Sequence, residues 1–242
     1  MTMIDEPAKA VRLHRLKPPP NSEVYLIKGA DKFPTHLIVS GVSLGYSQEG
    51  ELFRANCGHK FQQFRICPYC GRTIDGRNTR HTKPWGAKCA GQRIVTVDLA
   101  HRFETDTLQI RFNVVQPLPP AVDRTDFWIS FQTAFTMAAS DVLMIPPRDI
   151  DGTFRSQSDQ GSRGELVIYD RVPGGAGYVE RIQEELPQVL AETLRRTRDC
   201  KNRKCDPQGS CYACLRSYGN QFQWESLHRN LVSDWLSQVL SN

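Results

Sequence analysis

The sequence predicts an α+β protein in which a mixed sheet packs against helices and two four-cysteine modules bind zinc. Segments rich in β-branched residues are interspersed with segments of helical periodicity. The eight cysteines fall into two groups of four, separated by more than 100 residues without cysteine. With 39% hydrophobic residues in a chain of 242, a core of ordinary size can form.

The first elements are expected to be an arm, a strand and a hairpin. Residues 1–22 are basic and then proline-rich, which is typical of a loose arm or strap. HLIVSGV, residues 36–42, contains the β-branched run of a strand. YSQEGELFRANC, residues 46–57, is expected to form a turn and a hairpin arm that leads to the first cysteine.

Two further strands are predicted in the centre of the chain. RIVTVDL, residues 93–99, and DTLQIRFNVV, residues 106–115, alternate in polarity and are rich in β-branched residues. We expect a turn at 100–105 to connect them.

A long core-facing helix is predicted to begin at Phe127, with Asp126 as its cap. Its apolar residues recur with the spacing of one helical face. These residues are Phe127, Phe131, Ala134, Phe135, Ala138 and Val142.

The C-terminal part begins with GELVIYD, residues 164–170, a nearly continuous apolar strand of the kind found inside sheets. A glycine-rich turn follows, and then a helix with apolar positions Val179, Ile182 and Leu186. Pro187 is expected to begin a second helical stretch, and residues 222–240 have the pattern of a closing amphipathic helix.

These elements divide the chain into four expected regions. They are an N-terminal arm and strand region at 1–50, a first zinc module at 51–93, an α/β core with the glycine-rich turn at 94–199, and a second zinc cluster with the C-terminal helix at 200–242.

The cysteine spacing predicts two structural zinc ions. C-x2-C places two thiolates on one tight turn, and four ligands close the coordination shell, which favours a structural role over catalysis. The expected ligands are Cys57, Cys67, Cys70 and Cys89 in the first group and Cys200, Cys205, Cys211 and Cys214 in the second. His59 and His81 are alternatives to one cysteine of the first group, so three-cysteine, one-histidine ligation stays open.

The same cysteine usage indicates a reducing compartment, in which clustered thiols bind metal more often than they form disulfides. The sequence has no apolar run of 18 residues, and MTMIDEP has no feature of a secretory signal. We therefore expect a cytoplasmic protein without a membrane partner, and nothing in the sequence indicates a small-molecule substrate.

Basic charge accompanies the cysteines. Residues 54–93 contain nine Lys and Arg against one acid, and residues 194–216 contain seven against two, whereas residues 94–193 contain fifteen acids against eight Arg. Aromatic residues such as Tyr69 and Tyr212 lie among these basic ones, as in surfaces that bind nucleic acid. The candidate contacts to nucleic acid or a partner are Arg72, Arg77, Arg80, Lys83, Gly174, Gly175, Gly177, Arg203 and Lys204.

Two alternatives belong to other functional classes. A metal-dependent nuclease would need clustered carboxylates, for which Asp106, Asp141, Asp151, Glu165 and Asp170 are candidates, although solvated or capping roles are favoured for them. A zinc-stapled scaffold would join proteins without contacting nucleic acid.

Several stretches resemble a known family. FETDTLQIRF (103–112), FWISFQTAF (127–135), ELVIYDRVPGGAGYVERI (165–182) and the cysteine group at 200–215 are similar to the zinc-binding C-terminal domain of MrfA-type helicases. A version of that domain also occurs in DrmB of the DISARM anti-phage system. The resemblance covers roughly residues 50–230, implies zinc binding by the second cysteine group and implies work on DNA, but it names no catalytic residue.

The resemblance also implies a motor protein, yet these residues contain neither a G-x-x-x-x-G-K-[ST] sequence nor a helicase acidic box. We therefore expect a non-enzymatic accessory subunit that binds a helicase or ATPase in trans and contributes to DNA binding.

Overall fold

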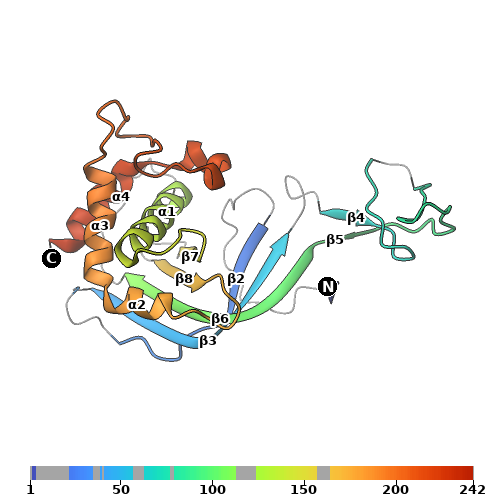
Figure 1. Ribbon diagram of the computed structural model, residues 1–242, viewed down its shortest axis with the longest axis horizontal. Coiled ribbons are helices and arrows are strands. Elements are labelled where there is room, and N and C mark those ends of the chain that lie inside the picture. The colour runs from blue at the N-terminus through green and yellow to red at the C-terminus, as the bar shows by residue number, and fades with distance from the viewer. Residues whose placement is uncertain are drawn as a thin grey trace.

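The computed structural model describes residues 2–3, 22–34, 39, 41–56, 63–76, 79–112, 124–156 and 164–241. A curved antiparallel sheet is covered on one face by helices, and a smaller cysteine-bearing module projects from the far end of two long strands (Figure 1). The predicted α+β class is confirmed. Within the described residues, no helix is both long and apolar enough to span a bilayer.

The large sheet has the strand order β2-β3-β6-β8-β7, and β1 pairs with Leu99 and Ala100 of β6, outside the segment that pairs with β8. All of these pairings are antiparallel, where the sequence led us to expect a mixed sheet. The strands are β1 (Thr2–Met3), β2 (Ser22–Lys28), β3 (Val42–Asn56), β6 (Leu99–Phe112), β7 (Ile150–Ser156) and β8 (Gly164–Asp170).

The two longest strands, β3 and β6, replace two turns expected from the sequence. Their pairing extends from Val42 opposite Phe112 to Asn56 opposite Leu99, with one irregularity between Ser47 and Gly50. The predicted turn at 100–105 is wrong, because each of these six residues pairs with a residue of β3 and the ladder continues through them. The turn expected within 46–57 is likewise strand, and most of the 36–42 strand prediction lies outside the described residues.

The helices follow the predicted order with shifted bounds. They are α1 (Arg124–Leu143), α2 (Tyr178–Glu184), α3 (Leu186–Arg198), the 3-10 segment η2 (Tyr218–Ser226) and α4 (Arg229–Leu240). Asp126 lies inside the first turn of α1 instead of preceding it, and Leu186 begins α3 instead of ending α2. The closing helix is shorter than predicted, because η2 occupies its first part.

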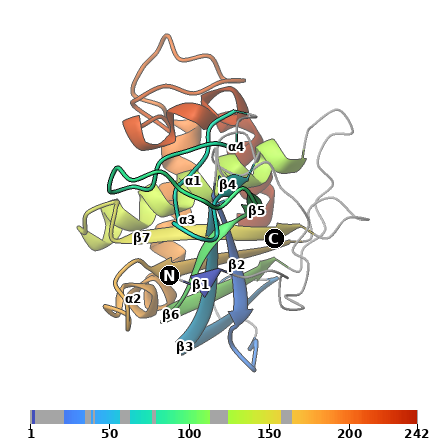
Figure 2. The ribbon, with the colours of Figure 1, turned by 90° about the vertical axis from the view of Figure 1, so that its right-hand side faces the viewer.

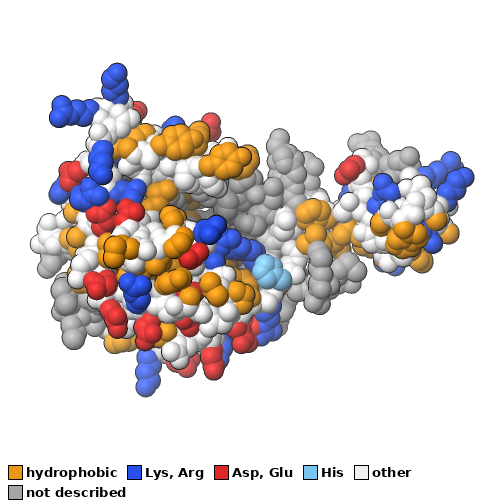
Figure 3. Space-filling model, in the orientation of Figure 1, with side chains coloured by type: hydrophobic (Ala, Val, Ile, Leu, Met, Phe, Trp, Pro, Cys, Tyr) orange, Lys and Arg blue, Asp and Glu red, His pale blue; other side chains and the backbone are white. Residues whose placement is uncertain are grey.

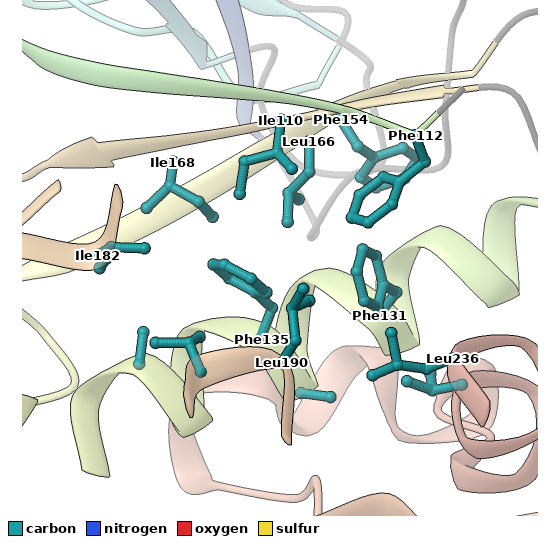
Figure 4. Packing of buried hydrophobic residues seen from close by; sticks show 14 of the residues in the cluster. Ile110, Phe112, Phe131, Phe135, Phe154, Leu166, Ile168, Ile182, Leu190 and Leu236 are labelled. Carbon is teal, nitrogen blue, oxygen red and sulfur yellow. The ribbon is translucent and has the colours of Figure 1, made fainter. Parts of the chain in front are cut away.

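The core lies between the sheet and α1, which is the innermost helix (Figures 1 and 2). Phe131 and Phe135 of α1 point at the apolar residues of β6 and β8, while Leu190 and Leu236 pack from α3 and α4 (Figure 4). The rings of Phe112 and Phe131 are 5.3 Å apart in an edge-on arrangement. All predicted apolar positions of α1 are buried except the half-buried Val142, so the predicted core face is confirmed.

The opposite face of the sheet has a second, smaller apolar cluster. Leu26, Leu52, Val167 and Tyr169 are buried there. The Tyr169 hydroxyl donates to Asp151 at 3.1 Å and accepts from the Arg54 guanidinium at 2.7 Å, and burial together with the Asp151 charge raises the pKa of Tyr169. These bonds join β3, β7 and β8 across this face.

The glycine-rich turn after β8 is built around two carboxylates. Asp170 accepts hydrogen bonds from the backbone amides of Ala176, Tyr178 and Val179, at 2.7 to 3.2 Å. Asp106 of β6 accepts from the Gly177 amide at 3.1 Å. Burial raises the pKa of Asp170, the amide hydrogen bonds oppose this shift, and the Asp106 charge adds to it. The turn therefore holds the start of α2 against the sheet.

We predict that alanine at Gly175 destabilises the protein more than alanine at Gly174. Both glycines have positive φ, 81° and 83°, so either substitution costs about 1–2 kcal/mol. A Cβ at Gly175 would lie 2.3 Å from the Asp106 carboxylate, whereas one at Gly174 would meet nothing within 4 Å. We expect the clash to add about 1–3 kcal/mol in denaturant unfolding. Equal losses for the two variants would show that the turn does not pack as described.

Candidate zinc centres and basic surfaces

The first cysteine module contains a tight turn that presents two thiols. Strands β4 (Phe64–Ile66) and β5 (Val95–Val97) pair at its base. The Gly71 amide donates to the Cys67 carbonyl at 2.8 Å, and Gly71 has φ 72°, which permits the chain to fold back as expected for CPYCG. Cys67 and Cys70 thereby lie on one turn.

A second turn of the module presents a histidine and a cysteine. Residues 81–89 form a hairpin in which Thr82 bridges Lys88 and the Cys89 amide donates to the His81 carbonyl at 3.1 Å. His81 and Cys89 are thus neighbours across the hairpin. The Arg72 guanidinium donates to the carbonyl and hydroxyl of Thr82, at 3.0 and 2.6 Å, and ties the two turns together.

The two turns bring together Cys67, Cys70, His81 and Cys89, whose ligand atoms lie within 4.8 Å of one another. The Cys67 and Cys89 sulfurs are 3.9 Å apart, and the Cys70 sulfur is 3.3 Å from His81 Nε2. Tetrahedral zinc with bonds of about 2.0–2.3 Å separates its ligands by roughly 3.3–3.8 Å, so this set fits zinc.

The structure therefore favours the three-cysteine, one-histidine alternative for this module. His81 Nδ1 lies 2.7 Å from the Thr79 carbonyl, which orients the ring with Nε2 toward the sulfurs, as in many zinc-bound histidines. Cys57 and His59 lie outside the described residues. In the sequence, the indication that His81 could be a ligand was its position eight residues before Cys89.

The second module gathers all four predicted cysteines, Cys200, Cys205, Cys211 and Cys214. The sulfur pairs Cys200–Cys211, Cys211–Cys214 and Cys205–Cys214 are separated by 3.6, 3.8 and 3.9 Å. These separations fit a tetrahedral zinc shell, and the cysteines are free thiols. Cys200 follows the C-cap residue of α3, Asp199, in agreement with the compact knuckle expected at the end of that helix.

Hydrogen bonds from backbone amides lower the pKa of one cysteine in each module, Cys67 in the first and Cys211 in the second. Burial raises the pKa of Cys67 and of Cys211, but this effect is outweighed by hydrogen bonds. Amides of Cys70 and Tyr69 and neighbouring thiols lower the pKa of Cys67 to about 7, and the Ala213 amide with the other cysteines lowers that of Cys211 to about 7. Both sulfurs are thereby inclined to the thiolate form that zinc requires.

The two modules differ in their support. Cys205, Cys214 and Leu215 are buried members of the main core, and Arg196 and Arg229 donate to the carbonyls of Cys214 and Cys205. Among the described residues, the first module makes no such core contact, and it extends away from the helices at the end of β3 and β6 (Figure 1). Metal bound to the second module would thus support the main domain, whereas metal bound to the first would support the projecting module alone.

The basic candidates lie at two separate places. Arg72, Arg80 and Lys83 belong to the projecting module, where Lys83 lies 5.6 Å from the Trp85 ring centre. Arg203 and Lys204 are exposed on the loop of the second module. Lys and Arg side chains gather at both outer ends of the molecule (Figure 3). Arg77 lies outside the described residues.

The glycine turn does not offer its amides to a phosphate. The Gly174 amide donates to the Glu104 carbonyl at 2.9 Å, the Gly175 amide to the Val172 carbonyl at 3.0 Å, and the Gly177 amide to Asp106. All three amides are occupied inside the fold, as in a tight packing turn, which was the other role that the sequence offered for these glycines.

The five carboxylates of the nuclease alternative are not gathered around one metal site in the described part of the chain. Asp106 and Asp170 bind the glycine turn, and Asp151 pairs with Arg54. Glu165 accepts from Gln109 and Arg111 at 2.6 and 2.7 Å, and Asp141 pairs with Arg196. Each has a structural partner, in agreement with the capping roles favoured from the sequence.

These features define a zinc-stapled α+β domain with two metal-binding modules. The family model of the MrfA Zn-binding domain matches residues 131–215, which extend from α1 to the last cysteine of the second module. The resemblance predicted from the sequence is thereby confirmed: this segment is similar to the MrfA Zn-binding domain. The first module lies outside the matched segment.

Two individual proteins extend the comparison. The chain is 30% identical over 171 residues to Druantia protein DruE of Escherichia coli (strain UMEA 4076-1), covering 66% of this chain and 9% of DruE. The crystal structure of the DUF1998 helicase MrfA bound to DNA is similar with a TM-score of 0.51 and 12% identity, covering 92% of this chain and 25% of that one. The chain thus spans only a small part of either relative, and the structural likeness shows a shared fold.

We predict that Cys211→Ser and His81→Ala each remove one zinc ion with different effects on stability. Loss of the second ion should lower the melting temperature of the main domain, because Cys205 and Cys214 belong to its core. Loss of the first should leave the main transition nearly unchanged. Zinc content by elemental analysis and melting by calorimetry provide the two measurements.

Cys57→Ser is the matched control for His81→Ala, since the sequence made both residues candidate ligands. Retention of both zinc ions by Cys57→Ser is the expected result. If Cys57→Ser lost an ion and His81→Ala kept two, the ligand set of the first module described above would be wrong.

Proposed function

We propose that this chain is a zinc-binding accessory subunit that binds a DNA helicase or ATPase in trans and increases the affinity of that motor protein for DNA. The observation that carries the proposal is the match of residues 131–215 to the MrfA Zn-binding domain, together with four assembled cysteines at the end of that segment. The solved relative named above is a helicase bound to DNA, which supports the same context.

The resemblance noted in the sequence gives the proposed setting. The domain occurs in MrfA-type helicases and in DrmB of an anti-phage system, so we place this protein in bacterial anti-phage defence or DNA repair, in the cytoplasm. Two zinc ions stabilise the chain in this role, one in each module. The chain itself supplies binding surfaces and performs no catalysis.

The charge distribution supports direct contact with DNA. In the projecting module Arg72, Arg80, Lys88 and Arg93 are exposed, while Asp75 is the one acid between residues 54 and 93. Such clustering favours the phosphate backbone, whose counterions are released on binding. The extension of this module from the core allows it to reach DNA held by a separate motor (Figure 1).

We predict that the chain binds DNA with a steep salt dependence that originates partly in the projecting module. Replacing Arg77, Arg80 and Lys83 by alanine should weaken binding at least about tenfold near 0.15 M salt and reduce the slope of log affinity against log salt by about two to three. Fluorescence anisotropy with labelled DNA measures both quantities.

The matched control replaces Lys28, Arg148 and Arg171, three exposed basic residues of the main domain, and changes the net charge equally. Binding by this control should remain close to that of the unaltered chain. A flat salt response, or equal losses in the two triple variants, would argue against the projecting module as a DNA contact.

We further predict that the tagged chain, recovered from its native cells after nuclease treatment, brings a helicase or ATPase with it in stoichiometric amount. Mass spectrometry identifies the recovered proteins, and nuclease removes those held only by shared DNA. Recovery of the chain alone would contradict the accessory role. Recovery of other proteins without a motor, by a chain that binds no DNA, would favour the scaffold alternative.

A further inference from the structure

The surface beside the second zinc module exposes several large aromatic side chains. Tyr212, Tyr218 and Phe222 are 66%, 82% and 73% exposed, although burial of such rings is favourable in water. Hydrophobic side chains lie along the edge of the main domain over this region, and Lys and Arg side chains lie at its outer end (Figure 3). Large exposed aromatic side chains grouped within a short segment are typical of binding surfaces.

The support beneath these rings is fixed by hydrogen bonds. Asn220 accepts from the Ser217 amide at 2.7 Å and donates to the Leu215 carbonyl at 2.8 Å. The Trp224 indole donates to the Asn220 side chain at 3.1 Å. Since Leu215 and Leu227 are fully buried at the two ends of this segment, η2 is anchored while its aromatic side chains face outward.

A cation completes the surface. The Trp224 ring contacts Tyr212 at 5.3 Å between ring centres, and the Arg216 guanidinium lies 5.1 Å from the same ring. Arg216 uses Nε to bond the Ser210 hydroxyl, and its two terminal nitrogens make no hydrogen bond within the described chain. The loop at 201–204 adds the exposed side chains of Lys201, Arg203 and Lys204.

We propose that Tyr212, Tyr218, Phe222 and Arg216 form a platform on which the bases of single-stranded DNA stack, with Lys201, Arg203 and Lys204 binding its phosphates. Aromatic and guanidinium planes bind base faces, and adjacent cations match the charge of the strand. Duplex DNA keeps its bases stacked on one another, so the platform selects the single strand. The inference rests on the proposed function and adds to it the type of DNA and the residues that bind it.

The test uses the full chain with both zinc ions and compares a 20-nucleotide oligo(dT) with a duplex of equal length by fluorescence anisotropy. Tyr218→Ala with Phe222→Ala should weaken oligo(dT) binding by about tenfold or more, since each substitution removes a ring on which a base stacks. Duplex affinity, zinc content and melting temperature should stay unchanged, because both side chains are exposed.

Two matched double variants separate stacking from other contacts. Tyr218→Phe with Phe222→Tyr keeps both rings and should bind oligo(dT) as the unaltered chain does. Tyr218→Leu with Phe222→Leu keeps apolar bulk without a ring and should bind as weakly as the alanine variant. Full binding by the leucine variant, or lost binding by the ring-preserving one, would overturn the stacking proposal.

The outcomes distinguish this inference from the proposed function. If the alanine variant binds oligo(dT) as well as the unaltered chain, the platform is wrong while DNA binding stands. If that variant keeps its DNA affinity but no longer recovers the motor, the surface is a protein interface and the platform is again overturned. If the unaltered chain binds neither oligo(dT) nor the duplex, both the platform and the DNA-binding role in the proposed function are wrong.

Discussion

The antiparallel pairing of β3 with β6 connects the two parts of this protein. Near Val42 and Phe112 the pair belongs to the sheet against which α1 packs, and near Asn56 and Leu99 it reaches the projecting module. Different neighbours flank its two ends: β8 pairs with β6 from Thr107 to Phe112, and β2 pairs with β3 from Glu51 to Asn56. The inner part is thereby joined to the helix-covered part of the sheet, while the outer part carries the first module away from the helices.

The two metal modules meet the same coordination requirement in different surroundings. In the second, buried cysteines and Leu215 continue the apolar core, and arginines from α3 and α4 hold the loop carbonyls. In the first, few residues are buried, and its main supports are the pairing of β4 with β5, the Arg72 bonds and the metal ligands themselves. A module with so small a core depends on metal to fold, because ligand binding supplies the free energy that burial does not.

Several acidic residues of the central region have structural partners. Asp106 and Asp170 satisfy the amides of the glycine turn and the first turn of α2, where unpaired buried amides would be costly. Glu165 and Asp151 are paired across the sheet. Exposed basic and aromatic side chains lie on both cysteine modules, among them Arg72 and Trp85 on the first and Lys204 and Tyr212 on the second.

The sequence by itself determined the α+β class, the buried face of α1, the internal position of β8, the clustering of Cys67, Cys70 and Cys89 and that of the four C-terminal cysteines, because periodicity and C-x2-C spacing are local properties. It did not reveal that residues 100–105 continue β6, since their mixed polarity resembles a turn until β3 provides partners for their backbone groups. Nor did it decide between Cys57 and His81, or show that the glycine amides are occupied by Asp106 and neighbouring carbonyls. These features depend on contacts between segments far apart in the chain, and only the tertiary structure brings those segments together.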